Sequence, residues 1–160
     1  MPSRFKIVIT GINLENIQAC TNFANRLAGL DHRVLSLDKN LCPLRILEIA
    51  CNNNNEVELW NIQRPTLPVP DICLFEAHGL VLIGSEIPKQ LFERSKYMPG
   101  RPDFPILWMT TDKSNRPPSQ PNSNFNIYQS PFTSPTDETM ANEFNNWLSK
   151  IVSGSNRGSP

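Results

Sequence analysis

Three short and almost entirely apolar runs place the strongest constraint on how this chain folds. They are Phe5–Gly11 (FKIVITG), Gly79–Gly84 (GLVLIG) and Pro105–Met109 (PILWM). Runs of this length, bounded by glycine or proline, are typical of strands that are buried on both faces. Such strands occur in parallel sheets that helices cover on each side, so the sequence predicts an α/β protein.

Helical patterns follow two of these runs and also end the chain. Asn13 can cap a helix that Gly29 ends, and Pro88 can start a second one. The last pattern is the most amphipathic, with its apolar residues on one stripe. The three apolar sets are Leu14, Ile17, Cys20, Ala24 and Leu27; Ile87, Leu91 and Met98; and Met140, Phe144, Trp147, Leu148 and Ile151.

A hairpin is predicted between the first helix and the second apolar run. Residues 46–51 and 56–61 are extended runs joined by four asparagines, and asparagine tolerates the left-handed conformations of hairpin turns. Residues 32–38 fit either a strand or a connecting loop, and the sequence leaves that choice open. Residues 125–128 predict a short final strand.

These elements fit one domain of 160 residues, in which 39% of residues are apolar and 19% are charged. The predicted fold is a three-layer α/β sandwich, with a mostly parallel central sheet and one antiparallel hairpin strand. The domain is expected to span residues 1–152, and residues 153–160 are expected to form a flexible tail.

Composition argues against several classes of partner and cofactor. Fifteen basic and fifteen acidic residues cancel, without a basic run, so a nucleic-acid partner is not expected. The four cysteines form no C-x-x-C pair, so neither a zinc site nor a redox motif is expected. The sequence has no apolar stretch long enough for a membrane span or a signal peptide. Cysteines in apolar surroundings predict a reduced protein of the cytoplasm or nucleus.

The order of the predicted elements resembles that of the Ras-superfamily G domain over nearly the whole chain. In Rab and Ras proteins the second hairpin strand ends in a motif like L-x-L-W-D-T-A-G-Q, and Glu58–Arg64 here is ELWNIQR. Residues 79–98 are similar to the next strand and helix of the family, and residues 102–113 to the strand before its guanine-recognition motif. The resemblance implies a small-GTPase-like topology, which is that of P-loop nucleotide-binding proteins.

The phosphate loop of that family is degenerate in this sequence. Its pattern G-x-x-x-x-G-K-[ST] supplies glycine amides, a lysine and a hydroxyl that binds magnesium. After Gly11, the last three positions are Asn16, Ile17 and Gln18. Glu15 adds a negative charge at the helix end that would otherwise attract phosphate. The loop is therefore unsuited to a nucleoside triphosphate.

The other nucleotide motifs are lost as well. Asn61 and Arg64 replace the aspartate and glycine of D-x-x-G. Met109–Asp112 (MTTD) keeps only the final acid of N-K-x-D, and the register shifted by two residues keeps none of it. Gln129–Pro131 (QSP) replaces S-A-K. The resemblance therefore implies a pseudo-GTPase, like the isolated domains found in centromere, trafficking and ciliary complexes.

We therefore expect a protein-binding scaffold or subunit of a larger assembly, without enzymatic activity. No cofactor, metal or guanine nucleotide is expected. The candidate partner site is the proline-rich loop in the place of the family's second switch. Its residues are Arg64, which precedes Pro65, and Leu67 and Val69, which stand between prolines. Proline stiffens such a loop and lowers the entropy lost on binding.

Three alternatives stay open. The first is a receiver-like or flavodoxin-like binding domain, in which residues 32–38 form a parallel second strand and the hairpin is absent. The second is a small GTPase that retains weak, atypical nucleotide binding. The third is an unconventional hydrolase, in which Glu76 orients His78 as a general base, with Asp71 nearby. For the three tryptophans, Trp60, Trp108 and Trp147, packing in the core is expected.

Overall fold

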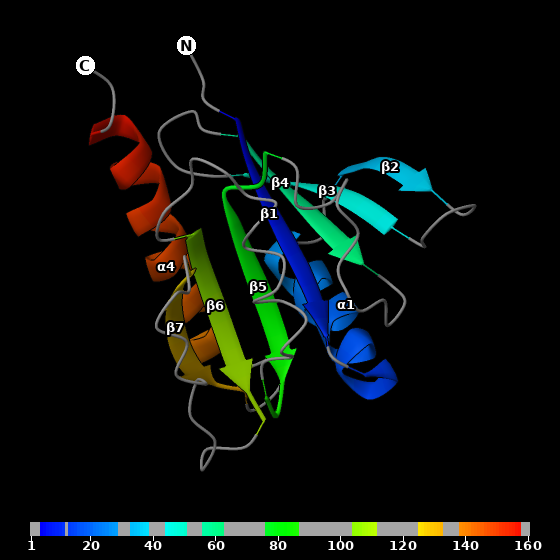
Figure 1. Ribbon diagram of the computed structural model, residues 1–160. Helices are drawn as coiled ribbons and strands as arrows, with labels where there is room; N and C mark the ends of the chain where they lie inside the picture. Colours follow the sequence, from blue (N-terminus) through cyan, green and yellow to red (C-terminus); the bar gives the residue numbers. More distant parts are fainter. Residues whose placement is uncertain are drawn as a thin grey trace.

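The computed structural model describes residues 4–11, 13–28, 33–38, 44–50, 56–62, 76–86, 104–111, 125–132 and 138–157. Seven strands of this part form one sheet in the order β2-β3-β4-β1-β5-β6-β7, with helices α1 and α4 (Figure 1). The elements are β1 Arg4–Gly11, α1 Leu14–Ala28, β2 Arg33–Asp38, β3 Leu44–Ala50, β4 Glu56–Ile62, β5 Gly79–Gly84, β6 Phe104–Thr110, β7 Phe125–Pro131 and α4 Glu138–Arg157.

One strand of the sheet runs against all the others. β3 is antiparallel to both of its neighbours, β2 and β4, whereas β4, β1, β5, β6 and β7 pair in parallel. The predicted class, an α/β fold with a mostly parallel sheet and one antiparallel hairpin strand, is confirmed. Residues 33–38, left open from the sequence, form the edge strand β2.

The receiver-like or flavodoxin-like alternative is wrong. It required residues 32–38 to be a parallel second strand and the hairpin to be absent, but Leu44–Ala50 pairs antiparallel with Glu56–Ile62 along its whole length. The physical reason is the alternation in β4, where Val57 and Leu59 are buried and Glu56 and Glu58 are partly exposed. A strand with this alternation has one buried and one partly exposed face, and β3 can pair beside it so that the two strands share these faces.

Helix α1 begins where its cap was predicted. The Asn16 N–H donates to Asn13 Oδ1 at 2.9 Å, and the Ile17 N–H donates to the Asn13 carbonyl at 2.9 Å. The first bond satisfies an amide group that a helix N-terminus otherwise leaves without an intrahelical partner, and the second is the first i to i−4 bond of the helix. Asn13 is thus the N-cap, two residues after β1 ends.

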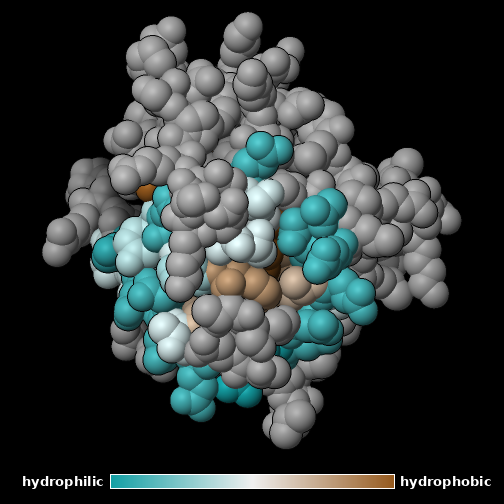
Figure 2. All heavy atoms as spheres, turned by 90° about the horizontal axis from the view of Figure 1, so that it is seen from below, coloured by the Kyte–Doolittle hydropathy of each residue, from teal (hydrophilic) through white to brown (hydrophobic). Residues whose placement is uncertain are grey.

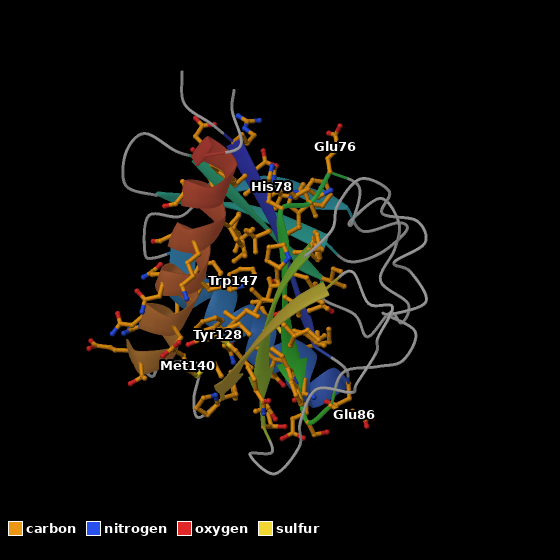
Figure 3. All side chains as sticks on the ribbon, turned by 60° about the vertical axis from the view of Figure 1, so that its left-hand side comes forward. Glu76, His78, Glu86, Tyr128, Met140 and Trp147 are labelled. Atoms are coloured by element: carbon orange, nitrogen blue, oxygen red, sulfur yellow. The ribbon has the colours of Figure 1, made fainter. Side chains whose placement is uncertain are left out.

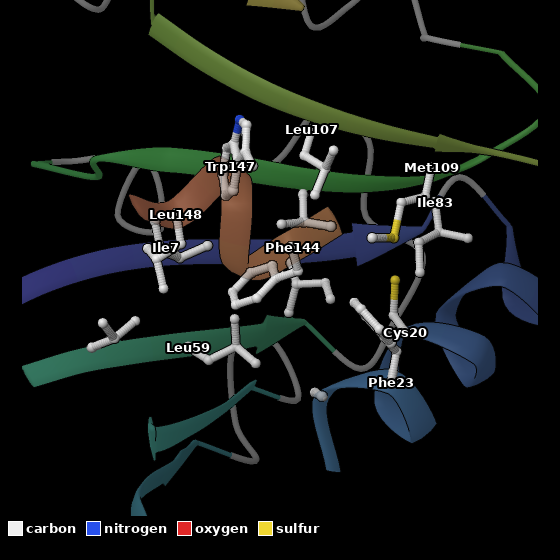
Figure 4. Packing of buried hydrophobic residues seen from close by; sticks show 14 of the residues in the cluster. Ile7, Cys20, Phe23, Leu59, Ile83, Leu107, Met109, Phe144, Trp147 and Leu148 are labelled. Atoms are coloured by element: carbon white, nitrogen blue, oxygen red, sulfur yellow. The ribbon is translucent and has the colours of Figure 1, made fainter. Parts of the chain in front are cut away.

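Helices α1 and α4 cover the same face of the sheet (Figures 1 and 4). Cys20 and Phe23 of α1 approach Ile83 and Met109 in the sheet, while Phe144 of α4 lies over the middle of the same cluster. The Phe23 and Phe144 rings meet edge to face, with centroids 6.3 Å apart. Cys20 is a free, buried thiol, and burial raises its pKa, so it packs as a small apolar side chain.

The opposite face of the sheet is also buried. Its cluster contains Val8, Ile62, Ala77, Leu80, Leu82, Phe104, Ile106 and Trp108. Because consecutive strand residues point to opposite faces, β1, β5 and β6 supply both clusters, which explains their continuous apolar runs. Burial of both faces is what the predicted three-layer arrangement requires. The predicted helix around residues 87–98 and the expected loop at 112–124 lie outside the described residues.

One strand and one helix end at a later residue than predicted. β7 extends to Pro131, beyond the predicted end at Tyr128. Helix α4 continues to Arg157, so the tail expected from residue 153 is wrong over residues 153–157. Ile151 and Val152 pack against the core, and the carbonyl groups of that last packed turn need donors about four residues further on. The helix therefore outlasts its apolar stripe by about one turn.

Candidate functional site

The carboxyl ends of the parallel strands form the edge at which open α/β sheets usually bind ligands. All four degenerate nucleotide motifs fall on this edge, after β1, β4, β6 and β7. Figure 2 looks at this edge along the strands and shows polar side chains around a small apolar area. The fold therefore brings the predicted site positions together, and their geometry decides what they are able to bind.

The phosphate-loop position is occupied by the first turn of α1. The helix begins at Leu14, three residues after Gly11, so the places of the loop are mostly helical. A Cβ built on Gly11 would lie 2.5 Å from the Asn16 carbonyl carbon, 2.7 Å from Asn16 Cβ and 2.7 Å from the Ile17 nitrogen. The end of β1 and the first turn of α1 are thus so close that a side chain at position 11 would collide with the helix backbone.

The three residues in place of the family's glycine, lysine and hydroxyl have different environments. Asn16 is buried, with 8% of its surface exposed, and Ile17 is buried in the core, with 3% exposed. Gln18 is exposed on the helix surface. Ile17 thus stabilises α1 against the sheet, where the family's lysine would contact phosphate. Glu15, also exposed, adds a negative charge to the first turn.

Asn61 lies at the end of β4 and is fully buried. It has the same orientation as Val57 and Leu59, toward the α1 side of the sheet. An amide carries no charge there, so the position cannot supply the acid of D-x-x-G. Arg64, the other residue of this motif, lies outside the described residues.

Hydrogen bonds within the protein join the ends of β5 and β6, where the family's guanine-recognition motif would follow β6. The Trp108 indole Nε1–H donates to the Gly84 carbonyl at 3.0 Å, and the Thr111 N–H donates to the same oxygen at 3.2 Å. Trp108 is fully buried and Thr110 is 3% exposed. The predicted packing role of Trp108 is confirmed, and its bond to Gly84 was not foreseen. Asp112 lies outside the described residues.

The β7 end completes this edge. The Phe132 N–H donates to the Thr110 carbonyl at 2.8 Å, and Ser130 is buried. Among the described residues of this edge, Ile17 and Asn61 stand where the G-domain motifs have a lysine and an aspartate. Within the described ranges, no group of three or more His, Cys, Asp or Glu side chains could hold a metal ion.

Glu76 and His78 lie at the end of the sheet opposite this edge. Glu86, which follows β5, lies at this edge (Figure 3). The Lys6 N–H donates to His78 Nδ1 at 3.0 Å, and the His78 N–H donates to the Lys6 carbonyl at 2.7 Å. The imidazole also packs edge to face against Phe5, with centroids 5.1 Å apart. His78 thus extends the pairing between β1 and β5, and Glu76, exposed and at φ 57°, forms the turn before it.

Trp60 is the one predicted core tryptophan that is only partly buried. The Lys6 ammonium lies 3.7 Å from its ring centroid, and its indole N–H donates to Glu58 Oε1 at 3.2 Å. Arg4 binds Glu56 and Glu58 beside it, at 2.9 and 3.2 Å. The hydrogen bond to Glu56 and the two negative charges raise the pKa of Arg4, which therefore keeps its charge throughout the accessible pH range.

Tyr128 is a surface residue that sequence reasoning did not single out. It is 43% exposed, its hydroxyl donates to Glu143 Oε2 at 3.1 Å, and the Lys150 ammonium lies 5.4 Å from its ring centroid. The bond to Glu143 and the negative charge of that carboxylate raise the pKa of Tyr128. The available signal was its place in the final strand predicted over residues 125–128.

The candidate partner residues Arg64, Leu67 and Val69 lie outside the described residues, as does Asp71. Nothing in the described part of the chain tests their predicted roles. Among the described helices, none has the length and the apolar character needed to cross a bilayer.

No protein-family model and no curated protein matches this chain. Its structure is similar to a crystal structure of the cytosolic domain of the T. maritima FeoB iron transporter in apo form, with 13% sequence identity and a TM-score of 0.49. The similarity covers 97% of this chain and 64% of that chain, less than two thirds of its length.

Proposed function

We propose that this protein is a nucleotide-independent pseudo-GTPase, a folded scaffold or subunit that binds a protein partner within a larger assembly. The proposal combines the α/β fold with the resemblance of the sequence to Ras-superfamily G domains. It assigns no catalytic residue, and it places partner binding on the proline-rich loop with Arg64, Leu67 and Val69.

The observation that most supports this proposal is the start of α1. A phosphate loop needs several residues of open backbone between its two glycines, so that their amides surround the phosphates. Here only Ile12 and Asn13 separate Gly11 from the helix, and the Asn13 side chain already accepts the Asn16 N–H. The amide groups that would bind phosphate are instead part of a capped helix.

The first experiment measures nucleotide in the freshly purified chain and its thermal stability with GTP or GDP and magnesium. At about 1 mM nucleotide, a dissociation constant of about 10 μM would add about 2.7 kcal/mol of stability. For a chain of this size, that corresponds to an increase in Tm of about 5–10 °C. We expect no bound nucleotide and no increase in Tm. Stoichiometric GTP or GDP, or a shift of that size, would instead favour a GTPase with atypical binding.

A second experiment separates the motif from its backbone. The triple variant Asn16→Gly/Ile17→Lys/Gln18→Ser restores the pattern G-x-x-x-x-G-K-S after Gly11. We expect no nucleotide binding by the variant, because the helix start removes the loop itself. Circular dichroism checks that the variant is folded. Binding of GTP by a folded variant would contradict the structural basis of the proposal.

The partner site is tested by affinity capture of the full chain from a cell extract, with mass spectrometry. The variant Leu67→Asp/Val69→Asp is expected to lose the proteins that the parent chain retains. The matched control Gln18→Asp changes an exposed residue of α1 and should retain them. Equal capture by all three proteins would remove the loop from the proposal.

A further inference from the structure

We draw no further inference here: the strongest candidate, the exposed flank of β7 and α4 where Tyr128 contacts Glu143 and Lys150, carries none, because nothing in the described part of the structure shows what covers it.

Discussion

Gly11 is the one residue of the phosphate-loop pattern that this chain keeps, and the structure predicts that its role is packing. In Gly11→Ala the new methyl group would lie 2.5 Å from the Asn16 carbonyl carbon and 2.7 Å from the Ile17 nitrogen. Both are backbone atoms of a helical turn, so the turn must move away from β1. Forcing an extra methyl group into a packed interior costs typically about 1–3 kcal/mol.

Two effects decide the net change. Alanine restricts the unfolded chain and recovers about 0.4–1 kcal/mol. Because the contacts are with backbone atoms, we take the packing cost near its upper limit, which leaves a net loss of about 2 kcal/mol. For a domain of this size, that corresponds to a fall in Tm of about 4–8 °C.

The assay is calorimetry or thermal denaturation without any nucleotide. Gln18→Ala, at an exposed position of the same helix, is the control and should change Tm by less than about 2 °C. If Gly11→Ala matches the control, the close contact between β1 and α1 does not exist, and the argument against a phosphate loop fails with it.

Three further predictions concern the cap, the core and the surface. Asn13→Ala should lower the free energy of unfolding by about 1 kcal/mol in urea denaturation, while Asn13→Asp, which keeps the cap acceptor, should not. Gly79→Ala would bring a methyl group to 2.7 Å from the Trp147 ring, so it should lose about 1–3 kcal/mol. Adding Trp147→Phe should recover part of that loss, and no recovery would refute the contact. In a Tyr97→Phe background, Tyr128 is the sole tyrosine, and ultraviolet titration should find its pKa above the ordinary value of about 10. Glu143→Gln should lower it. Since the raised pKa favours the neutral phenol in the folded state, the Glu143 contact contributes below about pH 10 and is lost as pH rises further.

Most of the fold follows from local patterns that tertiary contacts then reinforce. The apolar runs of β1, β5 and β6 predict strands buried on both faces, and both faces are buried. The stripe of α4 predicts the face that packs on the sheet. β2 could not be predicted, because it joins the sheet only by pairing with β3, with a shift in register between Val34 and Ser36. Such pairing depends on where β3 lies and not on the residues of β2 alone.

The sequence predicted where the motif positions lie in the fold, but not their local geometry. The resemblance to G domains placed the degenerate motifs after β1, β4, β6 and β7, where the structure has them. The sequence could not show that the Trp108 indole donates a hydrogen bond to the Gly84 carbonyl, since this bond joins residues 24 positions apart. Nor could it show that Lys6 pairs with His78, which makes the imidazole part of the pairing between β1 and β5.

Under the proposed function, the loss of nucleotide binding involves the backbone at the start of α1 as well as the identity of the residues. A lysine missing from an intact loop removes one charged contact, and a single substitution restores it. Here Asn13 caps the helix two residues after Gly11, and Asn16 and Ile17 pack into the space beside the strand end. Selection for phosphate binding would oppose each of these features, whereas selection for a stable domain favours them all. Under the proposed function, partner binding uses another surface, and the proline-rich loop with Leu67 and Val69 is the one to test.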